Sequence, residues 1–147
     1  DPDNEGYYKE NLDRAIAKFD ELDNKFADEL SKIKDKEKYF VVSHAAFNYL
    51  ADDYGLKQIA VTGISPEEEP SAKDLKTIAD FVKDKKIKTI FFEGKATPKV
   101  AETLAKNTGT KTSTLYTMEN LDDDMIAKGY IGLMEENLKA LVESFNE

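Results

Sequence analysis

The chain has 147 residues, of which 35% are charged and 40% hydrophobic, with 21 basic and 30 acidic side chains, one histidine and no cysteine. This composition is typical of one globular domain, and it excludes disulfide frameworks, thiolate metal sites and cysteine nucleophiles. No apolar run approaches the roughly 20 residues of a membrane-spanning helix. The formal charge of −9, without a stretch of clustered basic and aromatic residues, argues against nucleic acid as a partner.

A long amphipathic helix is predicted near the N-terminus. Its length of about 25 to 30 residues exceeds the usual globular range, so we expect residues 1–34 to form a spine that runs beyond its own domain. The aromatic residues Tyr7, Tyr8, Phe19 and Phe26 are expected to belong to the core. Because the sequence starts at Asp1 without a methionine or a leader, we expect it to be a piece of a longer protein. The prediction rests on large apolar residues that recur every three or four positions: Leu12, Ile16, Phe19, Leu22, Phe26, Leu30 and Ile33.

From residue 35 onward, short apolar runs alternate with helical patterns. The runs are rich in Val, Ile, Phe, Tyr or Thr and predict strands over residues 39–42, 58–62, 87–92 and 112–116. Helices are predicted over residues 45–54, 71–85, 97–107 and about 122–145. This alternation, with strands that are apolar almost throughout, predicts an α/β fold in which a four-stranded parallel sheet is sandwiched between helices.

Local signals predict where several of these helices begin and end. Gly55 is a natural stop for the first short helix. Ser71, with Asp74 three residues later, resembles a capping box, and Thr97-Pro98 resembles a cap followed by proline in the first turn. Residues 63–70 hold three consecutive glutamates between two prolines and are expected to form an exposed acidic loop.

Polar side chains follow three of the four predicted strands. Open parallel sheets bind ligands beyond the carboxyl ends of their strands. His44 comes directly after the first strand, Glu93 after the third and Glu119 in the loop after the fourth. In a strand order of 2-1-3-4, these three residues would leave three neighbouring strands at one edge of the sheet.

Each candidate has more than one interpretation. His44 is a metal ligand, an acid/base group, or a capping or core histidine. Glu93 binds metal directly, orients His44 through a hydrogen bond, or caps the helix that follows. The acidic run at residues 122–124 is best explained as a solvated cap of the last helix, and for Glu119 alone metal ligation is the minority interpretation. The sequence has no glycine-rich phosphate loop and no serine elbow, which disfavours phosphate binding and serine hydrolysis.

Five segments carry a family resemblance: YFVVSHAAFNYL at 39–50, DYGL at 53–56, GISPEEEPS at 63–71, IFFE at 90–93 and LYTMENL at 115–121. Together they resemble the zinc-binding solute-binding lipoproteins of bacterial ABC importers, a family also called cluster A-I or cluster 9. The resemblance implies two α/β lobes joined by one long rigid helix, with a single metal between the lobes. Residues 1–34 would then be the linking helix and residues 35–147 the C-terminal lobe, with the N-terminal lobe absent from this chain.

The resemblance also implies a metal site. Zinc-binding members supply a histidine after the first strand of this lobe and a carboxylate after the fourth, which correspond to His44 and Glu119. Glu93 is then left as a group that orients a ligand or has a structural role. Zn(II) is favoured over Mn(II), because manganese-importing relatives carry a carboxylate where His44 stands. The remaining ligands are histidines of the N-terminal lobe, so the site is incomplete in this chain, and we expect weak zinc binding or an ion shared between chains.

The function implied by this resemblance is capture of Zn(II) outside the cytoplasm and its delivery to an ABC permease, without catalysis. The protein would be a cell-surface lipoprotein of a Gram-positive bacterium whose anchor lies outside this chain. Because protons compete with the metal for the imidazole nitrogen, binding is expected to weaken in acid. Two alternatives remain: a surface adhesion module, and a doubly wound enzyme that uses His44 with Glu93 or Glu119 as an acid/base pair.

Overall fold

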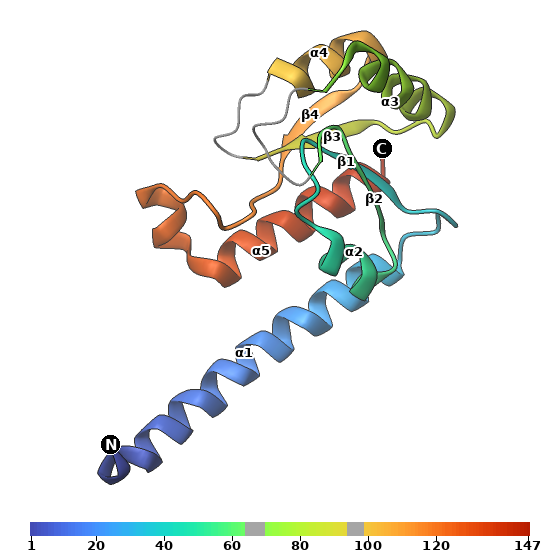
Figure 1. The fold of residues 1–147 in the computed structure, drawn as a ribbon. Helices are drawn as coiled ribbons and strands as arrows, with labels where there is room; N and C mark the ends of the chain where they lie inside the picture. The colour runs from blue at the N-terminus through green and yellow to red at the C-terminus, as the bar shows by residue number, and fades with distance from the viewer. Residues whose placement is uncertain (64–69, 94–98) are drawn as a thin grey trace.

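The computed structural model describes residues 1–63, 70–93 and 99–147. In this part of the chain, four strands form one parallel sheet in the order β2-β1-β3-β4, which confirms the predicted order (Figure 1). The strands are β1 (Tyr39–Val42), β2 (Lys57–Ala60), β3 (Thr89–Phe92) and β4 (Lys111–Thr114). After a short 3-10 turn at Pro2–Asn4, the helices are α1 (Glu5–Ser31), α2 (Asn48–Tyr54), α3 (Ala72–Asp84), α4 (Lys99–Thr108) and α5 (Asp123–Phe145).

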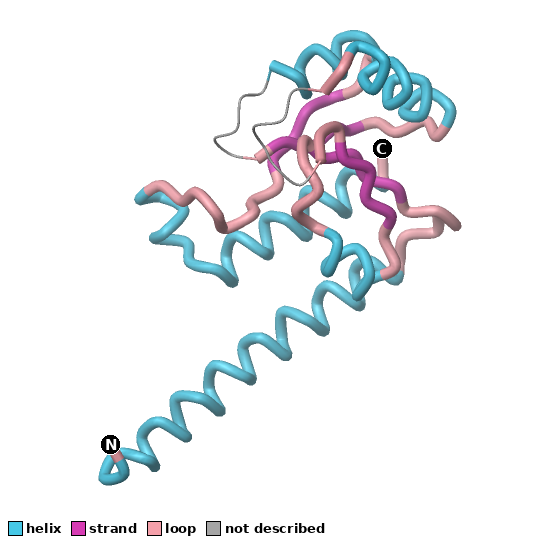
Figure 2. Tube along the Cα trace, viewed as in Figure 1, coloured by secondary structure: helices cyan, strands magenta, loops and turns pink. Residues whose placement is uncertain are grey.

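Helices cover both faces of the sheet, as Figure 2 shows. Alternate residues of a strand point to opposite faces. Phe40, Val42 and Phe91 pack into a core shared with α1, α2 and α5. Val41 and Ile90 pack into a second core with residues of α3 and α4. The central strands β1 and β3 are therefore buried on both faces, as their apolar sequences predict.

Only the second half of the apolar stripe on α1 is buried. Phe26 is 1% exposed and lies in the core, as expected. Tyr7, Tyr8 and Phe19 remain 62%, 51% and 51% exposed, so the expectation that they belong to the core is wrong. The reason is geometric, because the first turns of α1 extend away from the sheet and the other helices (Figure 1).

Helix α2 starts three residues later than predicted, at Asn48. The amide of Ala45 donates to the carbonyl of Gly63 (2.9 Å), and the amide of Ala46 donates to the carbonyl of His44 (2.9 Å). These bonds hold the residues after His44 in a loop. The helix ends as predicted at Gly55, which adopts the left-handed φ of 65°.

The predicted capping box at the start of α3 is confirmed. The Ser71 hydroxyl accepts from the Asp74 amide, and the Asp74 carboxylate accepts from the Ser71 amide. The acidic segment 64–69 and the predicted cap at Thr97-Pro98 lie outside the described residues. None of the described helices is long and apolar enough to cross a membrane.

Candidate metal site

The three residues singled out at the strand ends lie together in the structure. His44, Glu93 and Glu119 each offer one ligand atom, and these atoms lie within 4.8 Å of one another. Their elements are neighbours in the sheet, because β3 lies between β1 and β4. The sheet therefore gathers one imidazole and two carboxylates from residues up to 75 positions apart in the sequence, the difference between 119 and 44.

His44 and Glu93 form the buried part of this group, with exposed fractions of 2% and 8%. Nδ1 of His44 contacts Oε1 of Glu93, and the Ser43 hydroxyl donates a hydrogen bond of 2.8 Å to the same oxygen. This contact is not a hydrogen bond. In the described part of the chain, Nδ1 is accordingly the one buried side-chain polar atom without a hydrogen-bond partner. Buried polar atoms are normally paired, and the group that contacts this one is the Glu93 carboxylate.

The loop that carries His44 is fixed by the chain after β2. The carbonyl of Ser43 accepts from the amide of Thr62 (2.8 Å) and from its hydroxyl (3.0 Å). The amide of Ala45 is bonded to Gly63, so both neighbours of His44 have backbone partners. The imidazole is therefore presented from a rigid loop at the edge of the sheet.

Glu119 lies on the exposed side of the group. It follows Met118, whose φ of 67° lies in the left-handed region that non-glycine residues rarely adopt. The Asp122 side chain, three residues further along, accepts from the amide of Met125 (2.9 Å) and caps α5. This cap confirms that the acidic run belongs to the start of the last helix, whereas Glu119 lies with the site.

Two carboxylates and one imidazole in so small a space favour a bound cation, because a positive charge relieves the repulsion between the carboxylates. Nitrogen and oxygen donors together suit Zn(II), whereas hard cations such as Ca(II) and Mg(II) prefer oxygen alone. A tetrahedral zinc ion needs four ligands, so even all three residues would leave at least one position for another donor.

Two residues that matter here were not singled out from the sequence. Ser43 precedes His44 directly, but its bond to Glu93 follows from the pairing of β1 with β3. Asn137 is completely buried, and its side chain holds the backbone of Tyr116 in the loop that leads to Glu119. A signal for Asn137 was present, because it is a polar residue on an otherwise apolar helix face.

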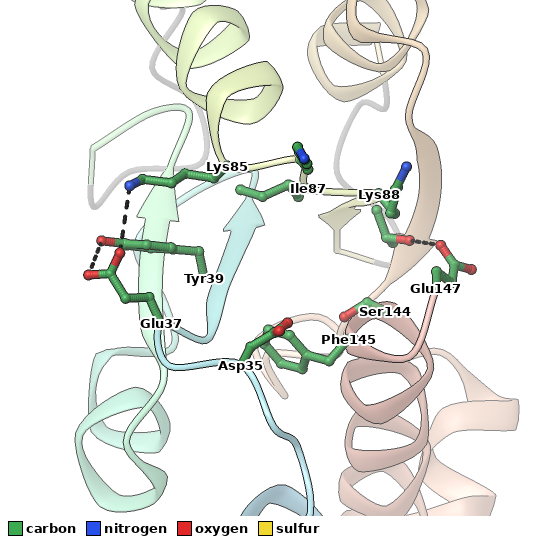
Figure 3. A pocket seen from close by; sticks show the side chains of 11 residues that line it. Asp35, Glu37, Tyr39, Lys85, Ile87, Lys88, Ser144, Phe145 and Glu147 are labelled. Carbon is green, nitrogen blue, oxygen red and sulfur yellow. Dashed lines mark hydrogen bonds and ion pairs between the residues drawn. The ribbon is translucent and has the colours of Figure 1, made fainter.

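A separate cavity of about 130 Å³ lies near the opposite edge of the sheet, where β1 and β3 begin (Figure 3). Three of its charged side chains, Glu37, Lys85 and Glu147, pair with charged or polar groups. Nζ of Lys85 lies 3.6 Å from a Glu37 oxygen, and the Thr89 hydroxyl donates to Glu147 (3.1 Å). These pairs leave no converging set of metal-binding groups among the described residues that line the cavity.

Comparison with known proteins identifies the family. Residues 1–144 match the family described as ZnuA, zinc-uptake complex component A, periplasmic. The high-affinity zinc uptake system protein ZnuA of Bacillus subtilis is 44% identical over 98% of this chain and 45% of its own length. The zinc-binding lipoprotein AdcA of Streptococcus pneumoniae is 44% identical over 99% of this chain and 29% of its own length. The chain thus spans less than half the length of these two relatives.

Solved structures agree with the sequence comparison. The Zn(II)-bound ZnuA-like domain of Streptococcus pneumoniae AdcA matches with a TM-score of 0.80 and 44% identity, over 99% of this chain and 55% of that one. The laminin-binding protein Lbp of Streptococcus pyogenes matches with a TM-score of 0.85 and 36% identity, over 99% of this chain and 54% of that one. This chain belongs to the ZnuA family of zinc-uptake components.

Proposed function

We propose that this chain is part of a zinc-uptake protein and that it binds Zn(II) through His44 and Glu119. The observation that carries the proposal is the convergence of these residues with Glu93 around a buried imidazole. The zinc-binding relatives support the choice of metal. The imidazole donor favours Zn(II) over Mn(II), for which carboxylate and water ligands are better suited.

Glu93 has a different role in this proposal. It lies against Nδ1 of His44, and a carboxylate at one imidazole nitrogen fixes the ring and makes the other nitrogen a better metal ligand. The Ser43 hydroxyl holds the same carboxylate oxygen, which leaves Glu93 little freedom to follow the metal. Glu93 thus orients the ligand, and Glu119, on the exposed side, completes the half-site.

The remaining ligands come from a second lobe. In this arrangement residues 1–34 are the linking helix and residues 35–147 the C-terminal lobe. Three exposed apolar residues on the first half of α1 support a second body that packs there: Tyr8 (51%), Leu12 (57%) and Ile16 (47%). The greater length of the relatives supports this division as well.

The biological role that fits this site is capture and delivery of zinc without catalysis. The protein would stand outside the cytoplasm as a lipoprotein of a Gram-positive cell and hand the ion to an ABC permease. Support comes from relatives that are named as a zinc uptake protein and as a zinc-binding lipoprotein. No step of this role requires His44 to move a proton to or from a substrate.

A second candidate function, surface adhesion, is favoured by one specific observation. Two structural relatives are described as laminin-binding, and one of them as bifunctional, with adhesin and metal-transporting activity. Adhesion would use the outer surface and not the buried imidazole. Laminin binding that persists unchanged in a His44→Ala variant would therefore separate adhesion from metal capture.

A zinc titration tests the main proposal. The native chain, His44→Ala, Glu119→Gln and the control Glu143→Gln are titrated with Zn²⁺ in competition with a chromophoric chelator. The side chain of Glu143 is exposed on α5 and lies 3.8 Å from Nζ of Lys139. Its variant removes the same charge as Glu119→Gln, but away from the site.

The expected order of affinity follows from the ligand roles. The control should bind like the native chain, whereas loss of either ligand should weaken binding by more than the roughly 10- to 100-fold effect of removing an outer partner. Equal affinities of Glu119→Gln and Glu143→Gln would overturn the role of Glu119. Sedimentation in the presence of Zn²⁺ shows whether the ion is bound by one chain or shared between chains. Tight one-to-one binding of Zn²⁺ by the monomer would contradict an incomplete site.

A further inference from the structure

We propose that Asn137 is a positioning residue for the metal site, because it fixes the loop that presents Glu119. This inference rests on the proposed function, in which Glu119 is a ligand. Asn137 lies on α5 and is itself remote in sequence from all three site residues. It acts through the backbone of the loop and not through contact with the metal.

The carboxamide of Asn137 binds both backbone groups of one residue. Its Oδ1 accepts from the amide of Tyr116 (2.8 Å), and its Nδ2 donates to the carbonyl of Tyr116 (2.9 Å). A carboxamide carries an acceptor and a donor side by side, so it can replace the neighbouring strand that would otherwise pair with this residue. Asn137 is 0% exposed, so leaving its polar atoms without these partners would be costly.

The two hydrogen bonds from Asn137 to Tyr116, called the clamp below, lie where the loop leaves the sheet. Leu115 still pairs with β3, because its amide donates to the carbonyl of Phe92 (3.0 Å). Tyr116 is the next residue and is held by Asn137. Glu119 comes three residues later. Asp122 then caps α5 by accepting a hydrogen bond from the Met125 amide. The clamp and the cap thus define the two ends of a five-residue span, 117–121, that contains the ligand.

The conformation of this span needs such support. Met118 adopts a left-handed φ of 67°, which a non-glycine residue keeps only when its surroundings hold it there. Among the described residues, the amide of Glu119 donates only a long hydrogen bond, of 3.5 Å, to the Thr117 hydroxyl. Within the described residues, the strong restraints are therefore those at Tyr116 and Asp122, and the first depends on Asn137.

A core asparagine that merely satisfies buried groups would have a different consequence. It would stabilise the fold, and its effect on zinc affinity would not depend on whether Glu119 is present. A positioning residue, in contrast, contributes to zinc affinity only while Glu119 can bind. The two roles are therefore distinguished by energetic coupling between Asn137 and Glu119 in metal binding.

The test is a double-mutant cycle on the 147-residue chain, with Zn²⁺ itself as the probe. Asn137→Asp keeps the acceptor for the Tyr116 amide but places an oxygen against the Tyr116 carbonyl, and Asn137→Leu removes both bonds. Each is combined with Glu119→Gln. The matched control is Thr89→Val, which removes the side-chain hydrogen bond of another buried polar residue, at the opposite edge of the sheet. The single histidine provides one set of imidazole NMR signals that reports Zn²⁺ binding, and dispersion of the amide spectrum reports folding.

With Glu119 present, the Asn137 variants should weaken Zn²⁺ binding by about 10- to 100-fold, the range known for partners that orient a metal ligand. In the Glu119→Gln background the same substitutions should change zinc affinity by less than about threefold, the deviation that distant, nearly independent sites still show. Thr89→Val should leave zinc affinity unchanged whether residue 119 is Glu or Gln. Equal factors in the two backgrounds, native affinity in a folded Asn137 variant, or failure of both variants to fold would overturn the inference. Failure of the proposed function looks different, because the native chain would then not bind or Glu119→Gln would bind as well as native.

Discussion

His44 and Glu93 face each other across the two central strands of the sheet, with Nδ1 of the imidazole against Oε1 of the carboxylate. The register of the sheet explains this contact. Val42 pairs with Phe91, so His44 and Glu93 each lie two residues beyond a matched pair of parallel strands. A shift of the register by one residue would turn one of the two side chains to the other face of the sheet.

This contact predicts the effect of Glu93→Gln. The substitution keeps the size of the side chain but removes the negative charge that holds the imidazole. Zinc affinity should fall by about 10- to 100-fold, the range for a partner of a metal-bound histidine. Chelator competition measures the change, with Glu143→Gln as the control for lost charge. A loss equal to that in His44→Ala would instead make Glu93 a ligand.

The kink in α5 predicts opposite effects for two glycines three residues apart. Gly129 has φ 67° and ψ 175°, a conformation that is essentially restricted to glycine, so Gly129→Ala should destabilise the fold by about 1–3 kcal/mol. A Cβ on Gly129 would meet no atom within 4 Å, and the cost is therefore one of backbone conformation. In Gly132→Ala the new Cβ lies 3.4 Å from the Lys128 Cβ, and helix propensity favours alanine by up to about 1 kcal/mol. Urea unfolding measures both, and equal effects would contradict the assignment of the kink.

The position of α1 predicts a large difference between two phenylalanines on that helix. Phe26 is 1% exposed and packs its ring 5.1 Å from that of Tyr54, so Phe26→Ala should cost about 3–5 kcal/mol of unfolding free energy. Phe19, with about half of its surface exposed, contacts only the ring of Tyr130 among the described aromatic rings, and its replacement should cost far less. Denaturant unfolding of the two variants measures the difference. Similar losses would show that the first half of α1 is packed in solution.

The capping box of α3 predicts a pH-dependent contribution to stability. Hydrogen bonds from the Ser71 hydroxyl and then the Ser71 amide lower the pKa of Asp74 below its ordinary value. Because the folded-state pKa is the lower one, this contribution is present above the unfolded pKa of about 3.9 and is lost as the pH falls through the folded value. Ser71→Ala should therefore raise the pKa of Asp74, as measured by carbon-detected NMR titration of its carboxyl group. Ser144→Ala, whose hydroxyl bonds a backbone carbonyl instead, should leave that pKa unchanged.

Local patterns in the sequence predicted the type and order of the elements but were less accurate about their limits. Gly55, Ser71 and Asp122 act through their immediate neighbours, and their roles are confirmed. The start of α2 was predicted too early, because residues 45–47 are held out of the helix by bonds to distant residues. Ala45 is bonded to Gly63, which follows β2, and Phe47 is bonded to Gln58 within β2. Burial of the α1 stripe was overestimated at its first half for a similar reason. Periodicity marks the apolar side of a helix, but only the other elements determine how much of it is covered.

The sequence by itself determined the alternation of strands and helices and the strand ends from which His44, Glu93 and Glu119 leave the sheet, since these depend on short-range periodicity and on the rule for parallel sheets. Only the tertiary structure decided that the imidazole lies against Glu93, that Ser43 bonds the same oxygen and that Asn137 clamps the loop before Glu119. These contacts join residues 21 to 50 positions apart. They arise from strand register and helix packing, which no local pattern of one segment contains.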